Sequence, residues 1–254
     1  MPQPPLADRI ALAKQKTQRL VDHTLDLLTL HETNRIVVYS PQLAKQIPQS
    51  YAAHAFNSFQ QSLYSFALIR LCVFWDECRT DDFDMESIPA VVNLIESVDV
   101  MDALQEEARR AHGQVPVFFG MEDHAPELRA EIEASLLAYA ENEAIREGQK
   151  AGARLATAVR WARRVGASNK LISVRNHRDK NLAHSLAVTR REKRGPVPVP
   201  KYGFERGLLW KTVAIVNRLH LGINGSGFVW KESMRIAREN AESLWTRCTF
   251  DVLR

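Results

Sequence analysis

Apolar side chains recur at helical spacing along nearly the whole chain, and this pattern constrains the fold more than any other feature of the sequence. Two long runs of this kind cover residues 6–31 and 51–78, and the second has a broad apolar face rich in phenylalanine. No segment shows the alternation of apolar and polar residues that marks a strand. The sequence therefore predicts an all-α fold, most simply an antiparallel helical bundle with a frame of long helices.

Capping residues give the starts of two further helices. Ser87 and Pro89 predict a first turn, from which a helix runs to about residue 111. Asp123 and Pro126 predict the start of another helix, which extends to about Arg164. About 40 residues is long for a helix in a globular protein, which indicates that this element is interrupted.

Glycines mark where that long helix is interrupted and where it ends. Gly148 and Gly152 predict a kink or a break within it. Gly166 predicts its end, and Ser168 or Asn169 predicts the cap of a short helix that follows. The short helix leads directly into the most charged segment of the chain.

Loop signals complete the pattern. The three prolines in RREKRGPVPVPKYG exclude both helix and central strand. The stretches GQVPVFFG and GINGSG predict loops, and two final helices are expected at about residues 204–221 and 228–248. The sequence contains no internal repeat, so we expect one helical domain over residues 1–254, with a helix and loop in residues 1–49 and the bundle core in residues 50–254.

The composition also indicates where in the cell the protein is found. No apolar run approaches the roughly 20 residues that span a bilayer, so no membrane contact is expected. The three cysteines have no metal-ligand spacing, and an odd number suits a reducing compartment. We therefore expect a cytoplasmic protein.

No group of residues has the spacing of a metal or cofactor site. The histidines form no His-x-x-x-His pair, and the acidic run in residues 76–86 fits no calcium loop, so it predicts a solvated loop. The carboxylates of Asp123 and Glu127, beside His124, are explained by the dipole at a helix start. GINGSG lacks the lysine of a phosphate-binding loop. We expect neither a metal nor a cofactor.

The net charge of +4 hides a strong asymmetry. Residues 1–149 carry 12 Lys and Arg against 23 Asp and Glu, whereas residues 150–194 carry 13 Lys and Arg against only Asp179 and Glu192. Such a basic stretch is typical of a surface that binds a polyanion. It is equally explained by a solvated helix face that pairs with the acidic part of the chain, and both interpretations stay open.

Residues 175–186, RNHRDKNLAHSL, concentrate the ionisable side chains. Within this segment, Arg178 and Asp179 are followed by four residues and then by His184. This spacing resembles the Arg-polar-x(4)-His pattern of the HEPN superfamily, and HRDKNLAHS resembles its abortive-infection, AbiU-type branch. The aromatic run FNSFQQSLYSFALIRL and the later FERGLLWKTVAIVNRLH are also similar to that branch, so the resemblance covers roughly residues 50–250.

The resemblance implies a HEPN-like helical bundle with extra helices at both ends. It also implies a metal-independent endoribonuclease that acts in phage defence or in a toxin–antitoxin pair, with RNA as the substrate and an antitoxin protein as a further partner. The chemistry is consistent, because RNA is cut when its own 2′-hydroxyl attacks the adjacent phosphate. Histidine has a pKa suited to moving the protons, and arginine binds phosphate oxygens in pairs.

These considerations assign roles to individual residues. His184 is the candidate general base or acid, and Arg178 is the candidate that binds the scissile phosphate. Asp179 is expected to orient Arg178 or His184 by a hydrogen bond. The candidate RNA-binding residues are Arg175, His177, Lys180, Asn181, Arg190, Arg191, Lys193 and Arg194. Trp161 or Tyr202 is available to stack on a base. A flexible loop explains the basic residues 190–194 equally well.

Helix geometry limits this assignment. On a continuous helix, residues six apart lie about 120° apart around the axis, so Arg178 and His184 would diverge. A helix interruption near residues 180–181, or a homodimer that pairs two motifs, would bring them together. His177 and His184 would instead align on an unbroken helix, with Asn181 about 40° away. Two further functions remain open: a non-catalytic RNA-binding or regulatory module, and a domain that binds another protein.

Overall fold

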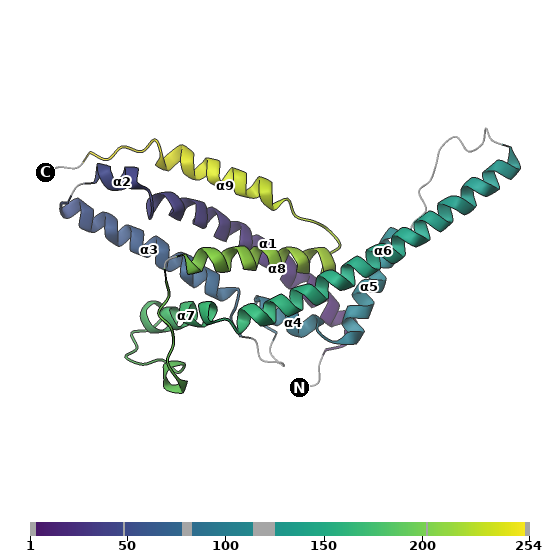
Figure 1. Ribbon diagram of the computed structural model, residues 1–254, viewed down its shortest axis with the longest axis horizontal. Coiled ribbons are helices and arrows are strands. Elements are labelled where there is room, and N and C mark those ends of the chain that lie inside the picture. Colours follow the sequence, from purple (N-terminus) through teal and green to yellow (C-terminus); the bar gives the residue numbers. More distant parts are fainter. Residues whose placement is uncertain (1–3, 48, 78–82, 114–124, 202, 252–254) are drawn as a thin grey trace.

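The computed structural model describes residues 4–47, 49–77, 83–113, 125–201 and 203–251 (Figure 1). These residues form helices and contain no strand, which confirms the all-α prediction. The α-helices are α1 (Leu6–Val37), α2 (Pro41–Gln46), α3 (Tyr51–Val73), α4 (Ile88–Ile95), α5 (Val98–His112), α6 (Pro126–Gly166), α7 (Asn169–His177), α8 (Phe204–Ile223) and α9 (Trp230–Trp245). A π-helical turn, η2 (Arg178–Leu182), follows α7, and a 3-10 turn, η3 (Glu192–Arg194), lies further on.

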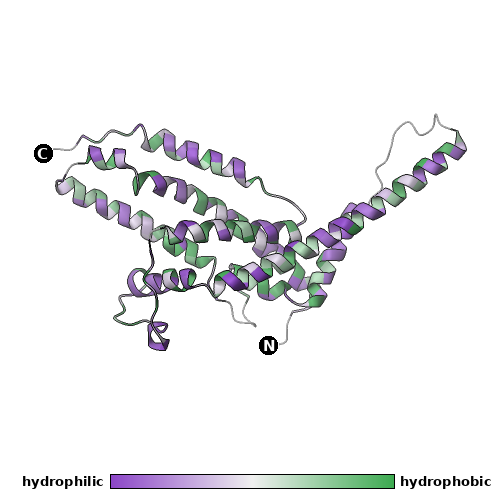
Figure 2. Ribbon diagram, viewed as in Figure 1, coloured by the Kyte–Doolittle hydropathy of each residue, from purple (hydrophilic) through white to green (hydrophobic). Residues whose placement is uncertain are grey.

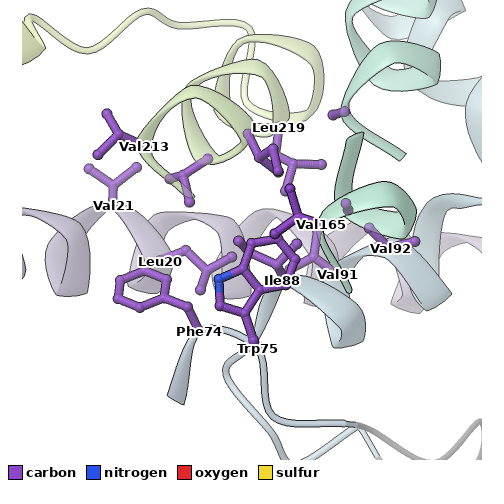
Figure 3. Packing of buried hydrophobic residues seen from close by; sticks show 14 of the residues in the cluster. Leu20, Val21, Phe74, Trp75, Ile88, Val91, Val92, Val165, Val213 and Leu219 are labelled. Atoms are coloured by element: carbon purple, nitrogen blue, oxygen red, sulfur yellow. The ribbon is translucent and has the colours of Figure 1, made fainter. Parts of the chain in front are cut away.

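Helix α1 lies at the centre of the packing. It contacts α3, α4, α8 and α9 along its length, and Figure 1 shows it between them. The buried core is made of aliphatic and aromatic side chains from these helices, together with residues of α5, α6 and α7 (Figure 3). The long helix α6 packs against α5 and α8, and its first half extends away from the rest of the bundle.

The single helix expected from Ser87 to about residue 111 is wrong, because the chain forms α4 and α5 instead. Ser97 adopts an extended conformation between them. The guanidinium of Arg9, which is only 5% exposed on α1, donates to the carbonyl oxygen of Leu94 at 3.0 Å and also to Ser97 Oγ. This long-range contact satisfies a carbonyl at the end of α4, and local sequence could not reveal it.

The kink or break expected at Gly148 and Gly152 is also wrong, because α6 continues through both glycines. Their role is to allow close packing against α5. A Cβ atom on Gly148 would lie 3.1 Å from the backbone oxygen of Gln105, and one on Gly152 would lie 2.6 Å from Gln105 Oε1. The absent side chains therefore let the two helices approach each other.

Other boundary predictions are confirmed. Ser87 caps α4 and Ser168 caps α7, because each side chain accepts a hydrogen bond from an amide in the first turn. Gly225 adopts a φ of 70° in the turn between α8 and α9. The stretch GQVPVFFG and Asp123 lie almost entirely outside the described residues. None of the described helices is long and apolar enough to cross a membrane.

The end of α3 is fixed by a buried aromatic pair (Figure 3). Phe74 is 2% exposed and Trp75 is 1% exposed, and the indole N–H of Trp75 donates to Thr212 Oγ1 of α8 at 3.0 Å. This hydrogen bond satisfies a polar group inside the core. The two acidic residues that follow, Asp76 and Glu77, are thereby held against α7, where the charged segment begins.

Candidate functional site

The charged segment begins on a helix with one buried face. Leu171 and Val174 of α7 are buried in the core, and Arg175 and His177 lie on its less buried side. Figure 2 shows that hydrophilic residues dominate at the end of α7, in η2 and in η3. The charged segment therefore continues from a helix whose apolar side chains pack in the core.

The helix does not continue from Arg178 to His184. The backbone N–H of Ala183 donates to the carbonyl oxygen of Arg178 at 2.8 Å, which closes the wide π-helical turn η2. Regular helix ends at Leu182, and His184 follows in non-helical chain with its side chain exposed. The two residues are thus freed from the fixed 120° separation of a continuous helix. Short π-helical turns are frequent at functional sites.

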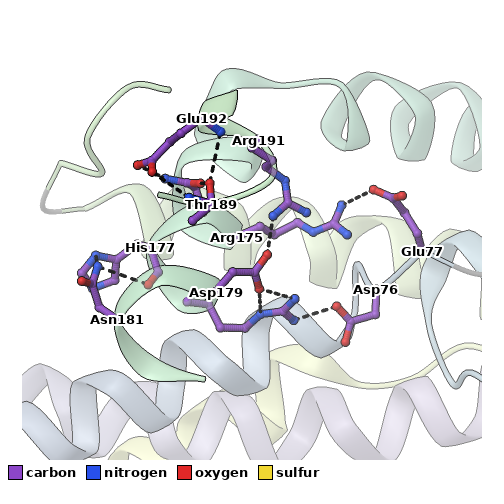
Figure 4. Close-up of polar contacts among 11 residues, drawn as sticks. Asp76, Glu77, Arg175, His177, Asp179, Asn181, Thr189, Arg191 and Glu192 are labelled. Carbon is purple, nitrogen blue, oxygen red and sulfur yellow. Dashed lines mark hydrogen bonds and ion pairs between the residues drawn. The ribbon is translucent and has the colours of Figure 1, made fainter. Parts of the chain in front are cut away.

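Arg178 is held between two carboxylates (Figure 4). Its Nη1 donates to Asp76 Oδ1 at 2.7 Å, and its Nε and Nη2 lie 2.9 and 2.8 Å from Asp179 Oδ1. The second oxygen of Asp179 accepts from Arg191. We call these four residues, Asp76, Arg178, Asp179 and Arg191, the arginine cluster. Two guanidinium groups and two carboxylates alternate in it.

The contacts of the arginine cluster shift the pKa values of Arg178 and Asp179 in opposite directions. Burial would lower the pKa of Arg178, but the hydrogen bonds and charges of Asp76 and Asp179 outweigh it and raise that pKa. Burial would raise the pKa of Asp179, but its hydrogen bonds to Arg191 and Arg178 outweigh it and lower that pKa. Arg178 and Asp179 therefore both stay charged over the physiological pH range.

A second ion pair extends the contact between α7 and the end of α3. Arg175 Nη1 donates to Glu77 Oε1 at 2.8 Å, with the arginine side chain mostly buried and the glutamate mostly exposed. The sequence pattern placed Asp76 and Glu77 in a solvated acidic loop, and their role as partners of motif arginines was missed. The opposite charge of the two halves of the chain was the only available signal.

A hydrogen-bonded turn fixes the basic residues that follow (Figure 4). Glu192 accepts from the amide N–H of Thr189 at 2.9 Å, from Asn176 Nδ2 at 3.0 Å, and from Lys180 Nζ at 3.0 Å. These contacts lower the pKa of Glu192 to about 2, the backbone N–H of Thr189 contributing most. Thr189 is itself buried and donates to Asn176 Oδ1. The start of the basic stretch at 189–194 is therefore folded onto α7.

The remaining candidate residues fall into two groups. His177 and Asn181 contact each other, with Asn181 Nδ2 3.1 Å from His177 Nδ1. Arg190, Lys193 and Arg194 are exposed, and none has an ion pair within the described parts of the chain. These three residues project from the turn that Glu192 fixes.

Trp161, one of the two residues considered for base stacking, lies on α6. The indole of Trp161 is partly buried in the core, and the guanidinium of Arg218 lies 4.0 Å from its ring centroid. One face of that ring is therefore already covered. Tyr202 lies outside the described residues.

The charge distribution is consequently uneven within the basic segment. Arg175, Arg178 and Arg191 are matched by carboxylates, and Lys180 is matched by Glu192. Within residues 175–194, the exposed cations of the 190–194 turn, Arg190, Lys193 and Arg194, have no carboxylate partner among the described residues. Among the described residues, no group of three or more His, Cys, Asp or Glu side chains is arranged to hold a metal ion.

Comparison with protein families gives one match. The model of a HEPN-type family described as AbiU2 matches residues 13–244, from α1 to the last turn of α9. The matched region includes α7, η2 and the basic turn. No curated protein and no solved structure gives a significant match.

Proposed function

The chain belongs to the AbiU2 family of HEPN proteins, and from this premise we propose that it is a metal-independent endoribonuclease. The family implies a role in abortive-infection phage defence. The observation that best supports cleavage is the setting of Arg178, a guanidinium oriented by two carboxylates, with the exposed His184 just beyond a π-helical turn.

In this proposal Arg178 binds the scissile phosphate. A guanidinium has five N–H groups, and the contacts with Asp76 and Asp179 use one on each nitrogen. One N–H on Nη1 and one on Nη2 remain for phosphate oxygens. The two carboxylates fix the plane of the Arg178 guanidinium before RNA binds. The guanidinium therefore needs little reorientation during the reaction.

His184 moves the protons. It takes the proton of the 2′-hydroxyl, whose oxygen then forms a bond to phosphorus while the bond from phosphorus to the 5′-oxygen breaks. The departing 5′-oxygen needs a proton, and the products end in a 2′,3′-cyclic phosphate and a 5′-hydroxyl. The neutral imidazole is the base in this step.

A second copy of the chain supplies the second proton-transfer group. One chain has a single His184, and it lies on the surface, where a twofold-related copy can face it. In such a homodimer one histidine acts as base and the other protonates the leaving oxygen. The exposed Arg190, Lys193 and Arg194 bind the flanking phosphates, which makes binding weaker as salt rises.

The test is cleavage of cellular RNA by the purified chain in EDTA. We expect fragments that end in 2′,3′-cyclic phosphate, and we expect His184→Ala to lose at least 100-fold in rate. His54→Ala, which changes an exposed histidine on α3, is the matched control and keeps full activity. Equal cleavage by wild type and His184→Ala would refute the proposal. Sizing of the purified chain tests the homodimer, and a monomeric mass with full activity would refute that part.

One observation favours a second function, an RNA-binding module without catalysis. The arginine cluster is internally neutral, so Arg178 has less excess charge to stabilise a reacting phosphate than a free arginine would have. This function predicts salt-sensitive binding of RNA, no cleavage, and unchanged affinity in His184→Ala. The same EDTA assay, combined with a binding titration, separates the two.

A further inference from the structure

A cavity of about 370 Å³ lies beside α8, where α1, α3 and α8 pack against one another (Figure 1). Its lining includes none of the residues assigned to RNA cleavage. Its volume lies at the lower end of the range of small-molecule sites, which are mostly apolar with a few placed polar groups. The cavity is therefore a second candidate binding site, and its lining indicates what kind of molecule fits it.

The interior of the cavity is apolar. Leu27 of α1, Leu71 of α3 and Leu209 of α8 form part of its wall, together with Ala67. The three leucines are at most 4% exposed, so the cavity reaches down to the core. An apolar group placed there gains free energy because it leaves water.

Aromatic rings form another part of the wall. Tyr64 and Trp210 line the cavity, and the ring of His31 meets that of Trp210 edge-on at a centroid distance of 5.8 Å. The pKa of His31 is lowered, chiefly by burial and also by the charges of Arg206 and Arg35. The imidazole is therefore neutral at pH 7, and this part of the wall adds no charge.

Three guanidinium groups from three different helices line the cavity as well. They belong to Arg35 of α1, Arg206 of α8 and Arg238 of α9, and all three residues are exposed. Arg35 and Arg238 both contact Glu32, whereas Arg206 has no ion pair among the described residues. The charge of Arg206 is therefore free to meet an anionic group at the edge of the cavity.

The two carboxylates of the lining are already engaged or out of reach. Glu32 is 3% exposed, and two of the arginines donate to its Oε2 at 2.9 and 3.5 Å. Glu205 Oε1 accepts from Tyr39 and from the amide of Gly203, both at 3.2 Å, and its Oε2 is buried where an occupant cannot reach it. An occupant therefore meets positive charge at the edge and apolar surface inside.

We infer that this cavity binds a small carboxylic acid, with its apolar body against the leucines and aromatic rings and its carboxylate at Arg206. A guanidinium holds a carboxylate by two parallel hydrogen bonds, which fixes the head group. An alcohol of the same length lacks the charge for these bonds, and an amine is repelled by the arginines. The inference goes beyond RNA cleavage and does not require it.

The experiment is calorimetric titration of the full chain at pH 7 with octanoate, with 1-octanol and with octylammonium. We expect octanoate to bind at least tenfold more tightly than the alcohol, and octylammonium to show no binding. Hexanoate should bind about tenfold more weakly than octanoate, since each buried methylene contributes roughly threefold to affinity.

Two substitutions test the two halves of the site separately. Arg206→Gln removes the charge from an exposed residue, and it should weaken octanoate at least tenfold while leaving 1-octanol and the melting temperature unchanged. Ala67→Phe fills part of the cavity and should weaken both ligands. Arg164→Gln, which changes an exposed arginine on α6, is the matched control and leaves both affinities unchanged.

Equal affinity for octanoate and 1-octanol, or an octanoate affinity that Arg206→Gln does not lower, would overturn the inference. Octanoate binding that survives Ala67→Phe undiminished would place the ligand elsewhere and overturn it too. The result is independent of catalysis, because His184→Ala should keep the full affinity for octanoate. A chain that binds octanoate but cuts no RNA would refute the proposed function and leave this inference in place.

Discussion

The arginine cluster lies against α3, and so does the cavity beside α8, which is lined by residues including Asn34, Leu71 and Glu205, yet the two regions satisfy their polar groups in opposite ways. In the arginine cluster, every carboxylate is bound by a guanidinium, and Arg178 contacts two of them. In the cavity, Asn34 and Glu205 each keep one buried oxygen without a partner. Both carboxylates of the arginine cluster are therefore paired, whereas two acceptors in the wall of the cavity are not.

This difference separates two kinds of preorganisation. A closed ion-pair network fixes the position of a reactive group and reduces the net charge around it. A buried acceptor without a donor instead adds nothing to the stability of the folded chain. A residue of the arginine cluster should therefore affect stability and catalysis together, while replacing an unpartnered acceptor in the wall of the cavity should cost little stability.

The largest expected effect comes from replacing the planar fork of Arg178. Arg178→Lys keeps the charge, but a single ammonium cannot bridge Asp76 and Asp179 and also hold a phosphate. We expect a loss of at least about 100-fold in the rate of RNA cleavage. The matched control is Arg190→Lys, an exposed and unpaired arginine, which should change the rate by less than about twofold. A similar loss in both variants would contradict a special role for Arg178.

The second prediction compares the stability lost when one carboxylate is removed from each of the two regions. Asp76→Asn removes a carboxylate from the half-buried Arg178 and should cost about 1–3 kcal/mol of unfolding free energy. Glu205→Gln removes a carboxylate whose Oε2 binds nothing, and should stay within about 0.5 kcal/mol of wild type. Chemical denaturation of the three proteins measures both values. If Asp76→Asn and Glu205→Gln lower the free energy of unfolding by the same amount, the contrast between the arginine cluster and the cavity is wrong.

A smaller effect depends on pH. The pKa of Glu192 is lowered from 4.5 to about 2 in the folded chain. The ionised form therefore stabilises the fold fully above pH 4.5, and this contribution is lost as pH falls toward 2. We expect Glu192→Gln to melt below wild type at pH 7 and to approach it near pH 3. A gap that stays constant across this range would show that charge is not the cause.

The smallest effect is expected at the outer ion pair. Glu77 is 77% exposed where it meets Arg175, so solvent screens the pair. Glu77→Gln should change the unfolding free energy by less than about 0.5 kcal/mol, and raising the salt concentration should reduce even that difference. Denaturation at low and high salt measures it. A cost equal to that of Asp76→Asn would mean that exposure does not distinguish the two pairs.

The local features of the fold were predictable, and the long-range ones were not. Ser87 and Ser168 were recognised as caps because a cap depends on only the next three residues. The break between α4 and α5 was missed because its cause, Arg9, lies some 85 residues earlier in the chain. Gly148 and Gly152 were misread for the same reason, since their neighbour Gln105 belongs to another helix.

In the candidate site, too, the local features were predictable from the sequence and the long-range contacts were not. The motif residues Arg178 and His184 were identified from their types and spacing. Their surroundings were not: Asp76 reaches Arg178 from 102 residues away. The cavity beside α8 was also missed, because it combines α1, α3, α8 and α9, and none of its residues stands out in the sequence.

The sequence by itself determined the helical class, most helix boundaries, the family resemblance and the ionisable residues of the charged segment. These follow from periodicity and from contacts between near neighbours in the chain. Only the tertiary structure decided which charges are neutralised, which remain exposed in the 190–194 turn, and which acceptors stay unpartnered in the cavity. The physical reason is that pairing and burial depend on distance in space, and the packing of α3 against α1, α7 and α8 sets those distances.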